Sequence, residues 1–248
     1  MILALIPARF ASARLPGKPL IKIDGLPLII HILKRVKMSK KIEKVVVCAD
    51  DLRIKKIVEK YGGDCQLTSK LHKNGTERIA EIAQKYKKKL KLIVDIQCDE
   101  LFLKPKYIDK LINFHLKKKK FDIVVPHSPI STAEAKDINT VKLISNFENK
   151  IVYMTRSLAP SFFRNKKKSK FCRHLDFISF KPKALFKYVN LKKSKNEISE
   201  SVELNRALDN NFNLGTLEIK TNDFSINTNS QLIMARKLIK KCQIRRKY

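Results

Sequence analysis

Ile2-Leu3-Ala4-Leu5-Ile6-Pro7-Ala8-Arg9 opens the chain, and Arg14-Leu15-Pro16-Gly17-Lys18-Pro19-Leu20 follows closely. The apolar run at residues 2–6 has the length and composition of a strand buried on both faces. The three prolines and the glycine after it predict a constrained loop, neither strand nor helix. Ligands of open α/β sheets bind just beyond the carboxyl ends of strands. We therefore expect Arg9, Arg14 and Lys18 to meet a polyanion, the alternative being an ordinary turn with solvated charges.

Composition places the chain among globular proteins. Its 248 residues are 44% hydrophobic, which is enough for a real core. No stretch reaches the ~18 to 20 apolar residues of a membrane span, and the apolar segment at residues 2–6 is too short for a secretory signal. The five cysteines are an odd number without a C-x-x-C pair, so neither a disulfide framework nor a zinc site is indicated. We expect a cytoplasmic protein.

The formal charge of +31 leaves a second class of function open. Such a charge favours nucleic acid or an anionic membrane surface as a partner. However, only twelve of the 54 basic residues are arginines, and lysine is the default surface residue of a chain with this composition. Aromatic residues are not interleaved with the lysines as base-stacking platforms require. Nucleic-acid binding therefore stays an alternative that charge alone supports.

Strands and helices alternate along the first half of the sequence, which predicts a parallel sheet with right-handed crossovers. The expected strands are residues 2–6, 42–49, 65–68, 92–96 and 121–126. The expected helices are residues 27–36, 52–60, 79–86, with Thr76 as a cap, and 105–116. The predicted fold class is thus α/β, with a mixed, mostly parallel sheet flanked by helices.

The regular alternation of strands and helices ends after residue 126. We expect a hairpin of residues 141–145 and 150–153, a strand at 177–180, and helices at 183–188 and 202–209. Residues 217–219 then return to the sheet, and 230–239 form a terminal helix. We interpret the chain as one domain, 1–248. An inserted part, 126–213, stands between the parts 1–125 and 214–248 and is expected to supply the substrate side and a dimer contact.

Several polar residues stand where ligands of a sheet would bind. Asp99 directly follows a buried strand, where a carboxylate for a divalent metal belongs, although a turn or cap is the alternative. Arg156, after another strand, is a possible ligand for an acidic substrate. His174 alone is a weak signal, and Glu200 and Glu203 are predicted to share one helix face, by default a solvated one.

Seven motifs in collinear order resemble the 3-deoxy-manno-octulosonate cytidylyltransferase family, also called CMP-Kdo synthetases. The first is the stretch Ile6-Pro7-Ala8-Arg9-Phe10-Ala11-Ser12-Ala13-Arg14-Leu15-Pro16-Gly17-Lys18-Pro19-Leu20. The others are His72-Lys73-Asn74-Gly75-Thr76-Glu77-Arg78, Ile96-Gln97-Cys98-Asp99-Glu100, Asn139-Thr140-Val141-Lys142, Thr155-Arg156-Ser157-Leu158-Ala159-Pro160, Arg173-His174-Leu175 and Glu200-Ser201-Val202-Glu203-Leu204. The resemblance extends to about residue 240.

The resemblance implies a nucleotide-diphosphosugar transferase type of fold, a homodimer and Mg²⁺ dependence. It implies that the anomeric hydroxyl of an acidic 2-keto sugar attacks the α-phosphate of CTP, which gives a CMP-sugar and pyrophosphate for lipopolysaccharide or another surface glycan. By position, the triphosphate ligands and catalytic cations would be Arg9, Arg14 and Lys18. The cytidine pocket would be Ala8, Thr76, Arg78 and Gln97, and the sugar ligands would be Arg156, His174, Glu200 and Glu203. Asp99 would bind the metal and act in catalysis.

One departure from the family pattern concerns the metal. The family's second metal aspartate is matched here by Asn227, which offers a neutral carbonyl oxygen and removes one negative charge. Two further interpretations remain open beside activation of 3-deoxy-manno-octulosonate (Kdo). The chain could activate an amino-Kdo or a nonulosonate sugar, or it could be a weakly active paralogue that binds nucleotide.

Overall fold

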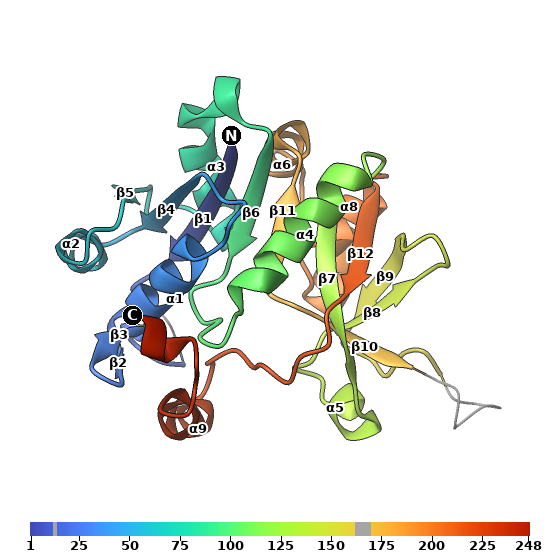
Figure 1. The fold of residues 1–248 in the computed structure, drawn as a ribbon. Coiled ribbons are helices and arrows are strands. Elements are labelled where there is room, and N and C mark those ends of the chain that lie inside the picture. Colours follow the sequence, from blue (N-terminus) through green and yellow to red (C-terminus); the bar gives the residue numbers. More distant parts are fainter. Residues whose placement is uncertain (12–13, 162–169) are drawn as a thin grey trace. The chain divides into compact units, whose positions relative to one another are not determined.

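The computed structural model describes residues 1–11, 14–161 and 170–248 (Figure 1). It divides the chain into two compact units, one of Met1–Ile112 with Asp223–Tyr248 and one of Asn113–Asn222. The predicted inserted part, 126–213, lies within the second unit. Ser12 and Ala13, which belong to the predicted polyanion loop, lie outside the described residues.

The first unit is organised around a parallel sheet. Its strands are β1 (Ile2–Ala8), β4 (Lys44–Ala49), β5 (Cys65–Leu67) and β6 (Leu92–Ile96), in the order β5-β4-β1-β6. All neighbours in this order pair in parallel. Every residue of β1 is buried, as expected for a strand covered on both faces.

The first strand runs two residues further than its apolar pattern indicated. Pro7 pairs with Cys48 and Ala8 with Ala49. The prediction that the strand stops before Pro7 was therefore wrong, because a proline is tolerated at a ladder position that needs no N–H donor. The predicted loop also contains one short helical turn, η1 (Lys18–Leu20). Gly17, directly before this turn, adopts the left-handed conformation with φ 65°.

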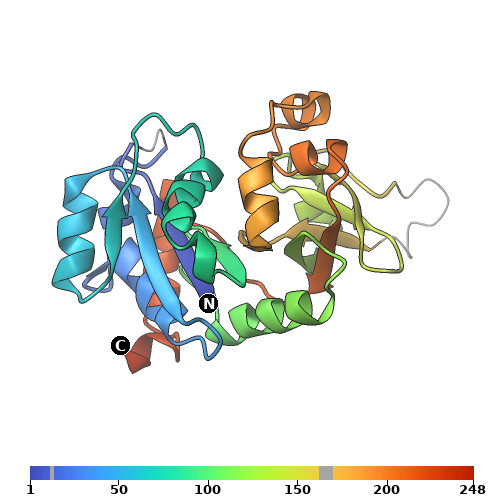
Figure 2. The same cartoon turned by 90° about the horizontal axis from the view of Figure 1, so that it is seen from above.

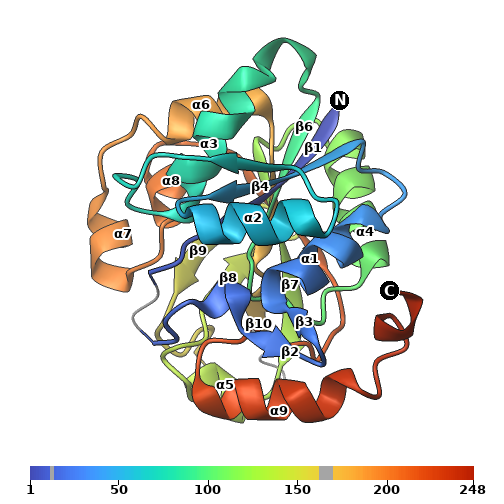
Figure 3. The ribbon, with the colours of Figure 1, turned by 90° about the vertical axis from the view of Figure 1, so that its left-hand side faces the viewer.

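Helices cover both faces of this sheet. α1 (Leu28–Lys37) and α2 (Leu52–Lys60) lie on one face and α3 (Gly75–Lys85) on the other (Figure 2). Figure 3 shows α2 in front of β4. Asn74, not Thr76, caps α3: its side-chain oxygen accepts from the Glu77 N–H at 2.8 Å. The expected cap was wrong by two residues because Thr76 already lies in the first helical turn.

The C-terminal residues belong to the same unit. The helix α4 (Pro105–Lys117) contains the boundary at which the chain leaves the first unit. After the second unit, the chain returns to the first with α9 (Asn229–Ile239) and a short helical turn, η3 (Arg245–Lys247). The Tyr248 hydroxyl lies 3.0 Å from His31 Nδ1 and accepts from Arg35 Nε at 3.0 Å. Burial lowers the pKa of His31 to about 4, so this ring is neutral near pH 7.

A small hairpin precedes α1. It consists of β2 (Lys22–Ile23) and β3 (Leu26–Pro27), which pair antiparallel. Asp24 and Gly25 between them have φ angles of 48° and 80°. Two consecutive left-handed residues are what a tight two-residue hairpin loop requires.

The second unit has a mixed sheet built around β7 (Ile123–Ile130). β12 (Leu214–Glu218) pairs with it in parallel, and β10 (Phe171–His174) and β11 (Phe177–Phe180) pair with it antiparallel. β8 (Lys142–Ser145) joins β10, and β9 (Ile151–Thr155) follows as the edge strand, which confirms the predicted hairpin. The helices of this unit are α5 (Thr132–Lys136), α6 (Pro182–Tyr188), α7 (Lys195–Glu200) and α8 (Asn205–Asp209).

The predicted helix over 202–209 is wrong at its start. Glu200 ends α7, Ser201 adopts φ 51°, and α8 begins only at Asn205. Glu200 and Glu203 therefore do not share a helix face. Within the described part of the chain, no helix is long and apolar enough to cross a membrane.

Candidate active site

Lys18 lies at the centre of a polar cluster at the carboxyl end of the first unit's sheet. Its ammonium group forms an ion pair with Asp99 Oδ2 at 2.8 Å, and both side chains are largely buried, at 13% and 14% exposed. The same nitrogen donates to the Ile226 carbonyl at 3.1 Å and to Asn227 Oδ1 at 3.2 Å. Three oxygens, from segments more than a hundred residues apart, thus converge on one cation.

The backbone fixes this convergence. The Ile226 N–H donates to the Asp99 carbonyl at 3.1 Å, which sets Asn227 beside Asp99. The side chain of Gln231, in α9, accepts from the Asn227 N–H at 2.8 Å, and Thr228 caps the same helix. The carboxylate of Asp99 and the amide oxygen of Asn227, the two positions for which the family resemblance implies a metal, therefore lie together.

This donor set fits a hard divalent cation. Carboxylate and carbonyl oxygens are the ligands that Mg²⁺ takes, usually one or two from the protein with phosphate and water oxygens besides. No group of three or more His, Cys, Asp and Glu side chains suited to a metal occurs among the residues described by the structure. A site here would consequently depend on oxygens of a bound phosphate as well.

The other predicted triphosphate ligands are more exposed than Lys18. Arg9 and Arg14 are both solvent-exposed, and Arg14 Nη2 lies 3.4 Å from Asn227 Oδ1. The Gly17 N–H donates to the Phe10 carbonyl at 3.1 Å, which closes the loop between them. The loop thus holds one buried and two exposed cations close to the end of β1.

Gln97, directly after β6, has a fixed amide orientation. Its Nε2 donates to both oxygens of Asp95 at 3.1 Å, and Asp95 is buried at 2% exposure. Because a carboxylate only accepts hydrogen bonds, the amide nitrogen has to face Asp95 and the carbonyl oxygen has to face away. A methyl group at Gly75, at the start of α3, would lie 3.6 Å from that oxygen.

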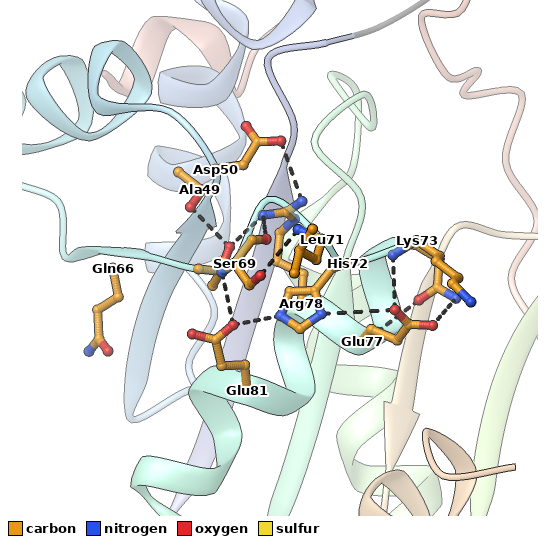
Figure 4. A network of polar contacts seen from close by, with 12 residues as sticks. Ala49, Asp50, Gln66, Ser69, Leu71, His72, Lys73, Glu77, Arg78 and Glu81 are labelled. Carbon is orange, nitrogen blue, oxygen red and sulfur yellow. Dashed lines mark hydrogen bonds and ion pairs between the residues drawn. The ribbon is translucent and has the colours of Figure 1, made fainter.

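Arg78 is held by several acceptors in a buried network (Figure 4). Its Nη1 donates to Thr68 Oγ1 and to the Ser69 carbonyl, and its Nη2 lies 3.4 Å from Asp50 Oδ2. Arg78 is only 2% exposed. Its guanidinium plane is therefore set by residues that follow β4 and β5. Of the other predicted pocket residues, Thr76 lies in the first turn of α3 and Ala8 is buried at the end of β1.

Two of the four predicted sugar ligands meet in the second unit. The Glu200 carboxylate accepts from Thr155 Oγ1 and from the Arg156 N–H, each at 2.8 Å. The Arg156 guanidinium donates to backbone carbonyls, those of Ile138, Asn139, Glu200 and Ser201 at 3.0–3.4 Å. Both groups thus tie the end of β9 to α7.

His174 and Glu203 do not join that contact directly. His174 Nε2 lies 2.8 Å from Asp176 Oδ1, and no described residue offers a partner to its buried Nδ1. The Glu203 carbonyl accepts from the Tyr188 hydroxyl at 2.8 Å. The backbone N–H of His174 donates to the Val141 carbonyl, which sets β10 beside β8.

Sequence reasoning missed three charged residues that order these sites. Asp50 and Asp95 hold Arg78 and Gln97, and Lys142 donates to the carbonyls of Asp137, Thr140 and Arg156 at 2.6–3.0 Å. Burial lowers the pKa of Lys142. A charged residue inside an apolar strand pattern, as Asp95 is in β6, was the signal that could have revealed one of them.

Cys98, a partly buried residue between Gln97 and Asp99, carries a free thiol. Burial, with the negative charge of Asp99 nearby, raises its pKa to about 12. It therefore stays neutral near pH 7 and adds no charge to the cluster around Lys18.

Comparisons with known proteins show the family to which the chain belongs. A family model described as cytidylyltransferase matches residues 3–220. A 3-deoxy-manno-octulosonate cytidylyltransferase of Leptospira interrogans is 35% identical over 232 residues, 93% of each chain. Its counterpart from Escherichia coli is 30% identical over 235 residues, 95% of this chain and 94% of that one.

Solved structures give the same result. The structure of a CMP:2-keto-3-deoxy-manno-octonic acid synthetase complexed with CTP matches with a TM-score of 0.93 and 30% identity, over 97% of this chain and 98% of that one. A putative glucose-1-phosphate thymidylyltransferase from Bacillus anthracis matches with a TM-score of 0.67 at 14% identity, over 96% and 95%, which shows the fold alone.

Fold and site together define a nucleotidyltransferase of the cytidylyltransferase class. More particularly, the chain belongs to the 3-deoxy-manno-octulosonate cytidylyltransferase family. The fold class and the family predicted from the seven motifs are confirmed.

Proposed function

We propose that this protein couples CTP to Kdo and releases pyrophosphate, and that the CMP-Kdo formed serves the synthesis of lipopolysaccharide or another surface glycan. The observation that carries the choice of nucleotide is the fixed amide of Gln97. The Asp95 carboxylate turns its Oε1 outward as a hydrogen-bond acceptor. Cytosine presents a 4-amino donor, whereas uracil presents a carbonyl at the same position, so this acceptor favours CTP over UTP.

The cytidine pocket of this proposal consists of Ala8, Thr76, Arg78 and Gln97. Ala8 and Gln97 stand at or just beyond the ends of β1 and β6, and α3 supplies Thr76 and Arg78. Arg78 is buried and already oriented by Asp50 and Thr68, so it donates to a base without a large entropy loss.

Arg9, Arg14 and Lys18 would bind the triphosphate and act in the reaction. The anomeric oxygen of Kdo forms a bond to the α-phosphorus, the bond from that phosphorus to the β-phosphate oxygen breaks, and the hydroxyl proton passes to solvent. The three cations stabilise the charge that develops on the phosphoryl oxygens and on the leaving pyrophosphate. Holding both reactants in one orientation lowers the entropic part of the barrier.

Asp99 and Asn227 would hold a divalent cation, for which we propose Mg²⁺. When bound, the metal supplies additional positive charge to the phosphate oxygens. Support comes from the convergence of Asp99 Oδ2, Asn227 Oδ1 and the Ile226 carbonyl on the Lys18 ammonium, since oxygens that surround one cation suit another.

The sugar side of the proposal rests on Arg156, His174, Glu200 and Glu203. In the structure Arg156 and Glu200 form hydrogen bonds with backbone groups. We therefore assign them the role of fixing the backbone that forms the sugar site at the end of β9. His174 Nδ1, which is buried and meets no partner within the described ranges, is the group best suited to a sugar hydroxyl or carboxylate.

Pyrophosphate release tests the function. We expect release with CTP and Kdo, with kcat/KM for UTP lower by at least about a hundredfold because Gln97 would meet a carbonyl instead of an amino group. The same assay is run with an amino-Kdo and a nonulosonate in place of Kdo. Intact CTP binding without release with any sugar would identify a paralogue that only binds nucleotide, and release with a rival sugar alone would reassign the substrate.

The metal assignment predicts the effect of Asn227→Asp. A carboxylate attracts Mg²⁺ more strongly than an amide, so half-maximal release should need about fivefold less Mg²⁺, equivalent to ~1 kcal/mol of added attraction. Binding of Mn²⁺, measured by electron paramagnetic resonance, should tighten in parallel. Asn229→Asp, which adds the same charge to an exposed position two residues away, serves as control. Equal metal requirements in both variants would show that Asn227 is not at the metal.

We further propose a cytoplasmic homodimer. β9 is an edge strand of the second unit, and its hairpin exposes Phe147 fully and Val152 at 59%. Exposed apolar groups at a sheet edge favour association. Sedimentation equilibrium should give a dimer for the wild type and a shift toward monomer for Val152→Lys, with Lys150→Met as a control on the same hairpin. A monomeric wild type at micromolar concentration would contradict the dimer.

A further inference from the structure

Asp50 connects two parts of the first unit that the proposed function assigns to different ends of CTP. It follows β4 directly and is 11% exposed. One carboxylate oxygen, Oδ1, accepts from the Phe10 N–H at 2.9 Å. The other, Oδ2, lies 3.4 Å from Arg78 Nη2 (Figure 4). One side chain therefore contacts both the loop after β1 and the guanidinium in α3.

On the loop side, Phe10 is the anchor. Its carbonyl accepts from the Gly17 N–H at 3.1 Å, which joins the start of the loop, beside Arg9, to its end, beside Lys18. The guanidinium of Arg53 lies 3.5 Å above the Phe10 ring centroid. Asp51 holds that guanidinium with bonds of 2.9 and 2.7 Å.

The space around Phe10 is tight as well. Gly17 has φ +65°, and a Cβ there would lie 3.3 Å from the Phe10 ring. Because the Gly17 N–H is also bound to the Phe10 carbonyl, a shift of the Phe10 backbone would displace Gly17 and the neighbouring Lys18. The position of the loop's cations depends on where Asp50 holds the Phe10 backbone.

On the other side, Arg78, in α3, donates to acceptors in the β5–α3 connection. Glu81 Oε2 accepts from the Ser69 N–H at 3.0 Å and lies 2.5 Å from His72 Nε2. Although burial raises the pKa of Glu81, these two hydrogen bonds outweigh it and lower the pKa overall. Glu81 stays ionised near pH 7, so the connection that carries the Arg78 acceptors Thr68 and Ser69 is itself held firmly.

We propose that Asp50 is a positioning residue that couples the triphosphate loop to the base-binding Arg78, so that one side chain fixes the two parts of the nucleotide site relative to each other. This inference rests on the proposed function for the identity of the ligand. It follows from the chemistry of the side chain: a carboxylate accepts from two donors, the Phe10 N–H and the Arg78 N–H, at once. An asparagine has one acceptor, one donor and no charge, so Asp50→Asn leaves one of the two donors unpaired and weakens the hydrogen bond to the other.

The variants separate the two sides. Asp50→Asn should disturb both, whereas Thr68→Val removes an acceptor of Arg78 and leaves Phe10 untouched. Asp64→Asn is the matched control, because Asp64 forms an exposed pair with Lys44 and contacts neither Phe10 nor Arg78. Thermal unfolding of each variant verifies that it is folded at the temperature of the assay.

Calorimetric titration uses CTP and inorganic tripolyphosphate, which has no base. Asp50→Asn should weaken the binding of both, CTP by about tenfold or more, since charged hydrogen bonds carry that magnitude. Thr68→Val should weaken CTP binding but leave tripolyphosphate unchanged, and Asp64→Asn should leave both unchanged. Unchanged tripolyphosphate binding in Asp50→Asn would overturn the coupling.

Hydrogen exchange supplies a readout that needs no ligand. In Asp50→Asn, the amides of Phe10 and Gly17 should exchange faster by about tenfold or more, and in Thr68→Val they should not. A wild type that binds CTP without releasing pyrophosphate would refute the proposed function alone. An active wild type in which Asp50→Asn behaves like Asp64→Asn would refute the coupling alone, and a wild type that binds neither CTP nor tripolyphosphate would overturn both.

Discussion

The ion pair between Lys18 and Asp99 is the interaction on which the site in the first unit depends. It joins the loop after β1 to the turn after β6, and the same ammonium draws in Ile226 and Asn227 from beyond residue 220. Parallel strands make this possible, since their carboxyl ends meet at one edge of the sheet. A charge pair this buried is costly when either partner is lost, so the three segments keep their places together.

Around that pair, buried carboxylates set the orientation of neutral and cationic groups. Asp95 turns the amide of Gln97, and Asp50 holds the Phe10 backbone and the Arg78 guanidinium. In the proposed function, these acidic residues shape the nucleotide site without having to touch the nucleotide. Their effect is to remove alternative rotamers from Gln97 and Arg78 before a ligand arrives, which reduces the entropy lost on binding.

Much of the fold was predictable because its pattern is local. The strands β1, β4 and β6 and the helices α1 to α3 follow from apolar periodicity and from turn residues such as Gly62. The cluster of Lys18, Asp99 and Asn227 was predictable as well, although only through the resemblance to a family, since no local signal joins residue 99 to residue 227. The structure confirms that they lie together.

The rest depends on contacts between distant residues that a pattern does not carry. Nothing in the sequence distinguishes Asp50, which contacts Phe10 and Arg78, from Asp51, which caps α2. The left-handed Ser201, which separates Glu200 from Glu203, is equally invisible to helical spacing. The strand β10 was not predicted, because its residues Phe171–His174 show no apolar alternation and pair only with strands that are remote in the sequence.

The most direct test of this account is the affinity of CTP for Lys18→Met, measured by isothermal titration calorimetry beside Lys22→Met, which removes an exposed lysine four residues away. The account predicts that Lys18→Met, verified as folded by its thermal transition, loses at least about tenfold in affinity, because the charge-assisted contact to phosphate that we propose for Lys18 is gone. Lys22→Met should bind as the wild type does. Equal affinity in the two folded variants would contradict the account.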